Sequence, residues 1–133
     1  DGRKADKLRT ILSAFSEYRL EVGLDDFEMA RLLATCSFGV IGCGSSLFEF
    51  GALKVPFVGL CVADNQELSA KRIEEMWSLP IVRSKEEAIS TIELAVAIRS
   101  IVAMLETGEA DKFGEIDLLG TQRVMRRIES LWR

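Results

Sequence analysis

Hydrophobic residues along the chain follow two patterns, which predict two kinds of element. In the first, apolar residues recur every three or four positions, as Leu8, Ile11 and Phe15 do, which favours an amphipathic helix. In the second, short apolar runs lie between glycine, proline or polar residues, which is typical of strands. The patterns predict helices over residues 4–15, 25–34, 45–54, 64–77, 84–106 and 119–131, and strands over 18–22, 38–41, 56–62 and 80–82.

Polar residues mark where several of these helices begin and end. Asp25 or Asp26 is expected to cap the second helix. The run Ser84-Lys85-Glu86-Glu87 has the spacing of a capping box, so we expect it to open the long fifth helix. We expect that helix to end at Thr107 and Gly108, because glycine is the usual residue just after a helix.

The alternation of helices with buried strands predicts the fold class. The run from Pro56 to Val62 is apolar at every position apart from Gly59, as in a strand that is covered on both faces of a parallel sheet. Repeated units of this kind predict an α/β fold with a Rossmann-like, doubly wound parallel sheet. We expect a single domain over residues 1–133. In such a sheet, ligands bind beyond the carboxyl ends of the strands, where the following helices begin.

The strongest candidate site is the sequence Gly-Cys-Gly-Ser-Ser, which follows the strand at 38–41. A small residue such as Gly44 lets a ligand approach the backbone, and the N-terminus of the following helix suits a phosphate. Ser45 and Ser46 add hydroxyl groups, and Glu49, one turn into the helix, has the chemistry to accept two ribose hydroxyls. The alternative is structural, because Ser46 and Glu49 have the spacing of a capping box. The run lacks the third glycine of a dinucleotide fingerprint and the lysine of a P-loop.

Two further strand ends carry polar or aromatic side chains. After the apolar third strand, Asp64, Asn65 and Gln66 bring donors and acceptors that suit sugar hydroxyls or a phosphate. The structural alternative is that Asp64 caps the next helix with Glu67 as its partner. After the first strand, Phe27 has the chemistry to stack on a base, although an aromatic residue at such a position is more often part of the core.

Charge and composition exclude several functions. The chain has 17 basic and 21 acidic residues among 133 and no dense basic cluster, so we expect it to bind neither nucleic acid nor an anionic membrane. It has no histidine, which excludes Ser-His-Asp triads, Cys-His dyads and histidine metal ligands. Its most apolar stretch, residues 92–105, contains Glu93 and Arg99, so we expect no membrane span.

The three cysteines indicate a reducing environment. Cys36, Cys43 and Cys61 lie in apolar runs and form no Cys-x-x-Cys pair, which argues against a zinc ribbon and a thioredoxin motif. The pattern predicts buried free thiols in a reducing compartment, and hence a cytoplasmic protein. We expect neither a metal nor a cofactor.

The polar strand ends, taken together, resemble a known family. The segment 38–56, followed by Ala63-Asp64-Asn65-Gln66, resembles the nucleotide-binding half of UDP-sugar enzymes with the GT-B architecture. The nearest resemblance is to the PseG-type UDP-sugar hydrolases of pseudaminic acid synthesis. Spore-coat polysaccharide proteins and MurG-type N-acetylglucosaminyltransferases are more distant. The segment 116–124 resembles the closing helix of the hydrolase group.

The resemblance implies a ligand-binding role for each matching position. These positions are Gly44, Ser45 and Ser46 for the diphosphate, Glu49 for the ribose hydroxyls, Asn65 and Gln66 for the sugar and phosphates, and Asp26 and Phe27 for the vicinity of uracil. The sequence departs from the family at Lys54, where the helix usually ends in glycine. It also departs at Cys43, where glycine or alanine is common.

The resemblance also implies a function for the whole protein. It implies a UDP-sugar-binding domain of a hydrolase or glycosyltransferase in surface-polysaccharide or nonulosonic-acid biosynthesis. The hydrolases take their catalytic histidine from an N-terminal domain, so we expect this chain to be a fragment that lacks the catalytic half and the first strands of its own sheet. A sheet edge left open in this way favours a homodimer, and the other outcome is a rearranged sheet in which the strand at 18–22 pairs differently. The alternative is a non-catalytic module that binds a partner protein, with a structural Gly-Ser loop.

Overall fold

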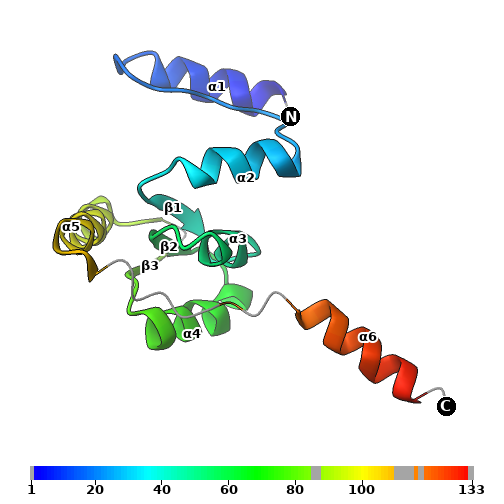
Figure 1. The fold of residues 1–133 in the computed structure, drawn as a ribbon. Helices are drawn as coiled ribbons and strands as arrows, with labels where there is room; N and C mark the ends of the chain where they lie inside the picture. The colour runs from blue at the N-terminus through cyan, green and yellow to red at the C-terminus, as the bar shows by residue number, and fades with distance from the viewer. Residues whose placement is uncertain (1, 85–87, 110–115, 117–118, 132–133) are drawn as a thin grey trace. The chain divides into compact units, whose positions relative to one another are not determined.

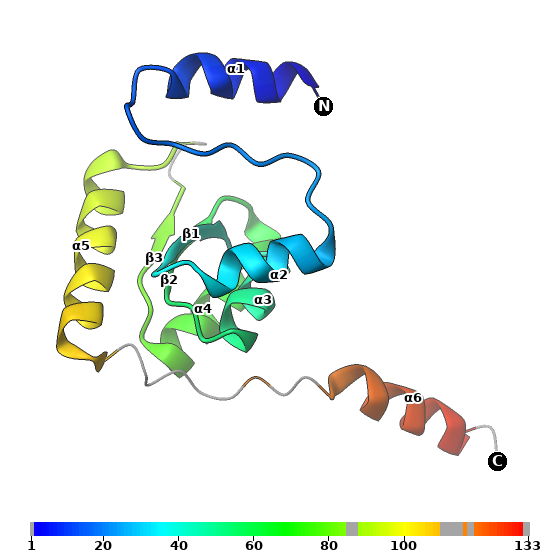
Figure 2. The same cartoon turned by 45° about the horizontal axis from the view of Figure 1, so that its top comes forward.

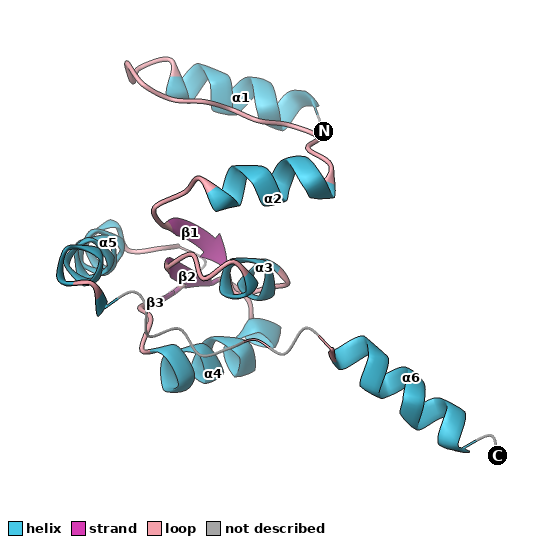
Figure 3. Cartoon of the chain, in the orientation of Figure 1, coloured by secondary structure: helices cyan, strands magenta, loops and turns pink. Residues whose placement is uncertain are grey.

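A computed structural model describes residues 2–84, 88–109, 116 and 119–131 of the chain (Figure 1). The chain divides into two compact units, residues 1–32 and residues 33–133, and each is described by itself. Helices predominate in the part of the chain that the structure describes, and the strands belong to the second unit (Figure 3). None of the described helices is both long enough and apolar enough to cross a membrane.

The first unit contains a helix and an extended segment where a strand was predicted. Helix α1 spans Gly2–Leu12, close to the predicted range. The strand predicted at 18–22 is wrong, because these residues form no strand in the structure. The side chains of Tyr18 and Val22 are 45% and 59% exposed, so the alternating pattern buries no apolar face. Without a neighbouring strand to pair with, alternation alone does not make a strand.

Helix α2, Asp26–Ala34, begins with the predicted acidic cap. The Glu28 N–H donates to Asp25 Oδ1 at 2.8 Å, and the Asp25 N–H donates to Glu28 Oε2 at 2.9 Å. This reciprocal pair is a capping box, and it confirms Asp25 as the cap. Phe27, in contrast, is 81% exposed, so the expectation that it belongs to a core is wrong.

The second unit is built on a parallel sheet of three strands. They are β1 (Gly39–Gly42), β2 (Phe57–Cys61) and β3 (Ile81–Arg83), and they lie in the order β1-β2-β3. Gly39 is in register with Phe57, and Gly59 with Ile81. Three of the four predicted strands are therefore confirmed, together with the predicted α/β class and the parallel arrangement.

Helices cover both faces of this sheet. Helices α3 (Ser46–Ala52) and α4 (Glu67–Trp77) connect consecutive strands and pack on one face, where Phe57 meets a ring from each. A short 3₁₀ turn, Asp64–Gln66, precedes α4. Helix α5, Thr91–Thr107, lies beside the sheet and contacts β2 and β3 (Figure 2). It buries Ala97 and Ile101. The β1–β2 and β2–β3 connections have the same hand, and each leads to the adjacent strand. Helices α3 and α4 therefore lie on the same face.

Aromatic packing and one glycine fix α3 and α4 against β2. The Phe57 ring lies edge-to-face with Phe50 at 5.9 Å and with Trp77 at 6.2 Å between centroids, an arrangement that aromatic quadrupoles favour. A Cβ atom on Gly51 would lie 2.5 Å from Trp77 Cη2 and 2.3 Å from Ile116 Cδ1. Gly51 therefore lets the indole of α4 pack directly on the backbone of α3.

The long helix α5 begins later than predicted. Ser84 does not cap it, because the Ser84 N–H donates to the Cys61 carbonyl at 2.8 Å and prolongs the pairing of β2 with β3. Residues 85–87 of the predicted capping box lie outside the described residues. The cap is Ser90, whose hydroxyl accepts the Glu93 N–H at 3.3 Å, so a second Ser-x-x-Glu run starts the helix. The end at Gly108, with φ of 70°, confirms the prediction.

Two shorter features agree with the pattern in the sequence. Helix α6 spans Gly120–Leu131, as predicted. At the end of α3, Lys54 adopts φ of 54°, the left-handed conformation that glycine favours. The Lys54 N–H donates to the Gly51 carbonyl at 3.1 Å and the Val55 N–H donates to the Phe50 carbonyl at 3.0 Å, which together make a Schellman motif.

Candidate functional site

The carboxyl ends of β1 and β2 lie side by side. The Cys43 N–H donates to the Leu60 carbonyl at 2.9 Å and extends the parallel ladder one residue beyond β1. The two loops that leave these strands therefore start at neighbouring points on one edge of the sheet. The predicted diphosphate residues Gly44, Ser45 and Ser46 follow the first strand end, and Asn65 and Gln66 follow the second. The structure brings these two groups to the same edge of the sheet.

At the end of β1, the polar side chains make no hydrogen bonds to the described residues. Ser45 is the N-cap residue of α3, and its side chain accepts no capping hydrogen bond. The capping box proposed between Ser46 and Glu49 is wrong, because the helix starts one residue too early for it and Phe48 holds the position three residues after the cap. Within the described residues, the hydroxyls of both serines and the Glu49 carboxylate have no hydrogen-bond partner.

At the end of β2, one of the predicted ligand residues is used locally. Gln66 Oε1 accepts the Val62 N–H at 2.9 Å and holds the loop against the strand end. Asp64 does not cap the following helix, since neither the 3₁₀ turn nor α4 has a side-chain cap. Asn65 is exposed and makes no hydrogen bond to the described part of the chain. Glu67, the expected partner of Asp64, instead faces β3.

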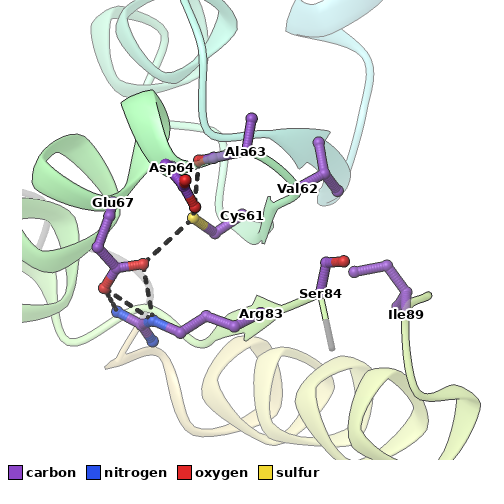
Figure 4. A pocket seen from close by; sticks show the side chains of 8 residues that line it. All are labelled: Cys61, Val62, Ala63, Asp64, Glu67, Arg83, Ser84 and Ile89. Carbon is purple, nitrogen blue, oxygen red and sulfur yellow. Dashed lines mark hydrogen bonds and ion pairs between the residues drawn. The ribbon is translucent and has the colours of Figure 1, made fainter. Parts of the chain in front are cut away.

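The largest polar cluster in the unit was not predicted, and it joins α4 to β3. Arg83 Nε donates to Glu67 Oε1 and Oε2 at 3.0 and 3.2 Å, and its Nη1 and Nη2 donate to the two oxygens of Glu74 at 2.9 and 2.7 Å. Cys61 Sγ donates to Glu67 Oε2 at 3.4 Å (Figure 4). Glu67 and Glu74 are seven residues apart, two helical turns, so both lie on one face of α4. That spacing, with an arginine ending the next strand, is a signal that the sequence contained.

Electrostatics make this cluster a stable set of ions. Hydrogen bonds from Arg83 lower the pKa of Glu67 and of Glu74 below their ordinary value. Hydrogen bonds to Glu74 and Glu67 raise the pKa of Arg83 above its ordinary value. Each group therefore stays charged at neutral pH, and the guanidinium directs its donors to the two carboxylates.

A hollow of about 860 Å³ opens beside this cluster, at the carboxyl ends of β2 and β3. Its lining is polar on one side, with Asp64, Glu67 and Arg83, and apolar on the other, where Ile89 lies (Figure 4). Its size suits a sugar-sized or larger ligand. The described residues contain no group of three or more acidic or thiol side chains that could hold a metal ion.

The remaining predicted residues divide between the two units. All three cysteines are free, and Cys43 and Cys61 are buried, which confirms the predicted free thiols. Asp26 and Phe27, predicted near uracil, belong to α2 in the first unit, and both are exposed. Their role stays a prediction. Comparison of the chain with protein-family models, with curated proteins and with solved structures gives no match.

Proposed function

We propose that this chain binds a UDP-sugar at the carboxyl edge of its sheet. In this proposal it is the nucleotide-binding part of a GT-B-like hydrolase or glycosyltransferase, with a doubly wound, Rossmann-like sheet. The enzyme would act in the cytoplasm on precursors of surface polysaccharides or nonulosonic acids. The residue pattern that resembles this family supports the proposal, and so does the general rule that ligands of parallel sheets bind at this edge.

One observation carries the proposal: the polar groups at the end of β1 have no partners in the part of the chain that the structure describes. The hydroxyls of Ser45 and Ser46 and the carboxylate of Glu49 make no hydrogen bond to the described residues. Polar side chains that lie next to a glycine, at the carboxyl edge of a sheet, are available to a ligand. Serine hydroxyls donate to phosphate oxygens, and a carboxylate accepts from vicinal hydroxyls, which matches a diphosphate joined to ribose.

The second group of residues extends the proposed site toward the sugar. Asn65, beside Gln66 at the end of β2, would contact the sugar and phosphates, and the adjoining hollow offers space for the sugar ring. Gln66 offers a ligand chiefly its amide N–H₂, because its oxygen already accepts the Val62 N–H. We therefore expect Gln66 to act chiefly by fixing the loop that presents Asn65.

The chain would supply binding rather than catalysis. It contains no histidine, and in the family that it resembles a histidine from another domain acts as the base. Groups that hold the diphosphate would stabilise the charge that develops on the leaving UDP. We expect the chain by itself to bind UDP and to release none from a UDP-sugar, and a turnover assay checks this. Robust release of UDP would contradict it.

Titration of the isotope-labelled chain with UDP tests the proposal. NMR shift changes are expected at residues 43–49 and 63–66, with weaker binding of UMP because it lacks the second phosphate. Replacing Glu49 by alanine should weaken UDP binding by about 1–3 kcal/mol, through loss of a charge-assisted hydrogen bond. The Glu75→Ala variant is the matched control, because it removes another exposed carboxylate, from α4, where Glu75 pairs with Lys71.

Two results would contradict the proposal. Millimolar UDP could leave the amide signals at the sheet edge unchanged, or Glu49→Ala and Glu75→Ala could weaken binding equally. Either would favour a module that binds a partner protein. Helix α6 supports that second candidate, because Val124, Met125, Ile128 and Leu131 are all exposed on it, as in a helix that docks into a groove.

The proposed assembly is a homodimer. β1 lies at one end of the strand order in the described sheet, and Val40 on it is 41% exposed, so an edge of this kind offers backbone groups to a second chain. The binding partners in the proposal are thus a UDP-sugar, a catalytic domain and a second copy. Light scattering at micromolar concentration measures the mass, and a species of 14.8 kDa would contradict the dimer.

A further inference from the structure

Two of the three cysteines face each other across neighbouring strands. Gly42 is in register with Leu60, and the next hydrogen bond, from Cys43 N–H to the Leu60 carbonyl, continues that register. Cys43 therefore lies opposite Cys61. Neighbouring parallel strands are about 4.8 Å apart, which lies within the Cα–Cα range of disulfide-bonded cysteines.

The two thiols also point to the same side of the sheet. A Cβ atom on Gly59 would lie 3.0 Å from Cys43 Sγ, so Cys43 faces the side of the sheet to which Gly59 belongs. Cys61 is two residues after Gly59 on the same strand, so it shares that side. Cys43 is 1% exposed and Cys61 is 6% exposed, so both thiols are buried on that side of the sheet.

Access differs between the two thiols. Cys61 lines the hollow at the ends of β2 and β3, where its sulfur points toward Glu67 and the Ala63 carbonyl (Figure 4). Cys43 does not line that hollow. A small molecule that enters the hollow therefore meets Cys61 before it can reach Cys43.

We propose that Cys61 and Cys43 form a dithiol that a small disulfide entering the hollow converts to an intramolecular disulfide. The Cys61 thiolate attacks the small disulfide, forms a mixed disulfide and releases one thiolate. The Cys43 thiolate then attacks Cys61 Sγ, forms the Cys43–Cys61 bond and releases the second thiolate. The dithiol loses two electrons and two protons, and the small disulfide becomes two thiols. This inference rests on strand register and does not depend on UDP binding.

Burial and charge set the pH at which the exchange runs. Burial raises the pKa of Cys43 to about 11, and the nearby Cys61, Glu67 and Glu74 raise it while Arg83 lowers it. Burial and the hydrogen bond to Glu67 raise the pKa of Cys61. Both thiols are therefore protonated at neutral pH, and the rate of exchange should rise about tenfold per pH unit through the mildly alkaline range.

Mass spectrometry after incubation with oxidised glutathione tests the proposal. The full-length Cys36→Ala chain is used, because no lysine or arginine separates Cys36 from Cys43 and trypsin would leave them on one peptide. At about pH 8.5, the intact mass should fall by two hydrogens, and a non-reduced digest should contain a peptide that links Cys43 to Cys61. An excess of reductant should reverse both changes.

A second substitution, added to Cys36→Ala, establishes the order of attack. With Cys43→Ala, the chain should accumulate one glutathione at Cys61, since no second thiol resolves the mixed disulfide. With Cys61→Ala, Cys43 should stay unmodified. If Cys36→Ala, with both thiols of the pair in place, keeps glutathione at Cys61 as stably as Cys43→Ala does, or if neither thiol reacts, the proposal is wrong. The Cys36→Ala measurement decides the matter even where a second substitution prevents folding.

Discussion

The polar side chains at the two ends of the sheet's carboxyl edge differ in their hydrogen bonding. At the end of β1, the hydroxyls of Ser45 and Ser46 and the Glu49 carboxylate have no partner among the described residues. At the ends of β2 and β3, Glu67 and Arg83 hold each other through several hydrogen bonds, and Gln66 holds its own loop. Both ends are rich in polar residues, and both follow a parallel strand.

The difference indicates which polar residues are available to bind a ligand. A charged group that already has a partner loses that partner when a ligand takes its place, so the gain is small. A group without a partner exchanges only water for the ligand. By this criterion, substitutions at the end of β1 should change ligand affinity, and substitutions in the cluster around Arg83 should change stability. Four experiments, with substitutions or changes of pH, test this division between binding and stability.

The glycines near α3 should show the largest contrast. The Gly51→Ala change places a methyl group 2.5 Å from the rigid indole of Trp77, so we expect a loss of roughly 1–3 kcal/mol in the free energy of unfolding. A methyl group on Gly44 would meet nothing within 4 Å. Gly44→Ala should therefore keep its stability and lose UDP affinity, because the backbone can no longer approach a phosphate. Urea unfolding and UDP titration measure the two quantities.

Removing Arg83 should lower stability without changing UDP affinity. The Arg83→Ala variant leaves Glu67 and Glu74 without their shared cation on one face of α4. Because these side chains are partly exposed, water screens much of the loss, and we expect the melting temperature to fall by roughly 3 °C. The matched control is Arg72→Ala, because Arg72 lies on α4 with the two carboxylates and forms no ion pair with either of them in the described part of the chain. A fall in UDP affinity at unchanged stability would reverse the division.

Acid should weaken the same cluster. The pKa values of Glu67 and Glu74 are lowered below the ordinary 4.5, so the unfolded chain binds protons to these groups at a higher pH than the folded chain does. Their contribution to stability is therefore complete above about pH 4.5 and is lost as the pH falls through the folded pKa values. Melting temperatures recorded from neutral pH to about pH 3 should fall less steeply for Arg83→Ala than for the unmodified chain. Parallel curves would contradict this account.

The smallest effect is expected at the end of α3. Lys54 holds a left-handed conformation that costs a residue with a side chain about 1 kcal/mol relative to glycine. Lys54→Gly should raise the free energy of unfolding by only roughly 0.5 kcal/mol, because the greater freedom of glycine in the unfolded chain offsets part of this gain. UDP affinity should stay unchanged, since the substitution lies at the opposite end of the helix from Ser45. Lys54→Ala is the control, and it should not stabilise the protein.

Local patterns in the sequence predicted the elements of the second unit well. Gly108 marks the end of α5, because a helix end depends on neighbouring residues only. The run at 56–62 forms β2, because its residues are apolar on both faces and two other strands, β1 and β3, pair with it. The predicted strand at 18–22 failed for the opposite reason. A strand needs a partner from elsewhere in the chain, and alternation of apolar and polar residues carries no information about that partner.

The sequence predicted that the two polar loops lie at one edge of the sheet, but it did not predict their hydrogen bonds. The strand ends located Gly44 and Asn65 at one edge, because parallel strands align their carboxyl ends. The capping interpretations of Ser46 and Asp64 failed by a single residue of helix register, which spacing alone does not fix. The cluster of Glu67, Glu74 and Arg83 depends on the pairing of β3 with β2, a contact that becomes visible only in three dimensions.

The strand order β1-β2-β3 has a consequence for how the second unit folds. Each strand pairs with the strand that follows it in the chain, so each pairing closes a loop of one helix and its turns. Closing a short loop costs little chain entropy, and proteins with such local contacts fold faster than those that join distant segments. Residues 39–83 should therefore reach their native pairing in a single cooperative step, in milliseconds rather than seconds. Stopped-flow refolding of the Trp132→Phe variant, whose remaining tryptophan, Trp77, packs on α3 and β2, would resolve that step.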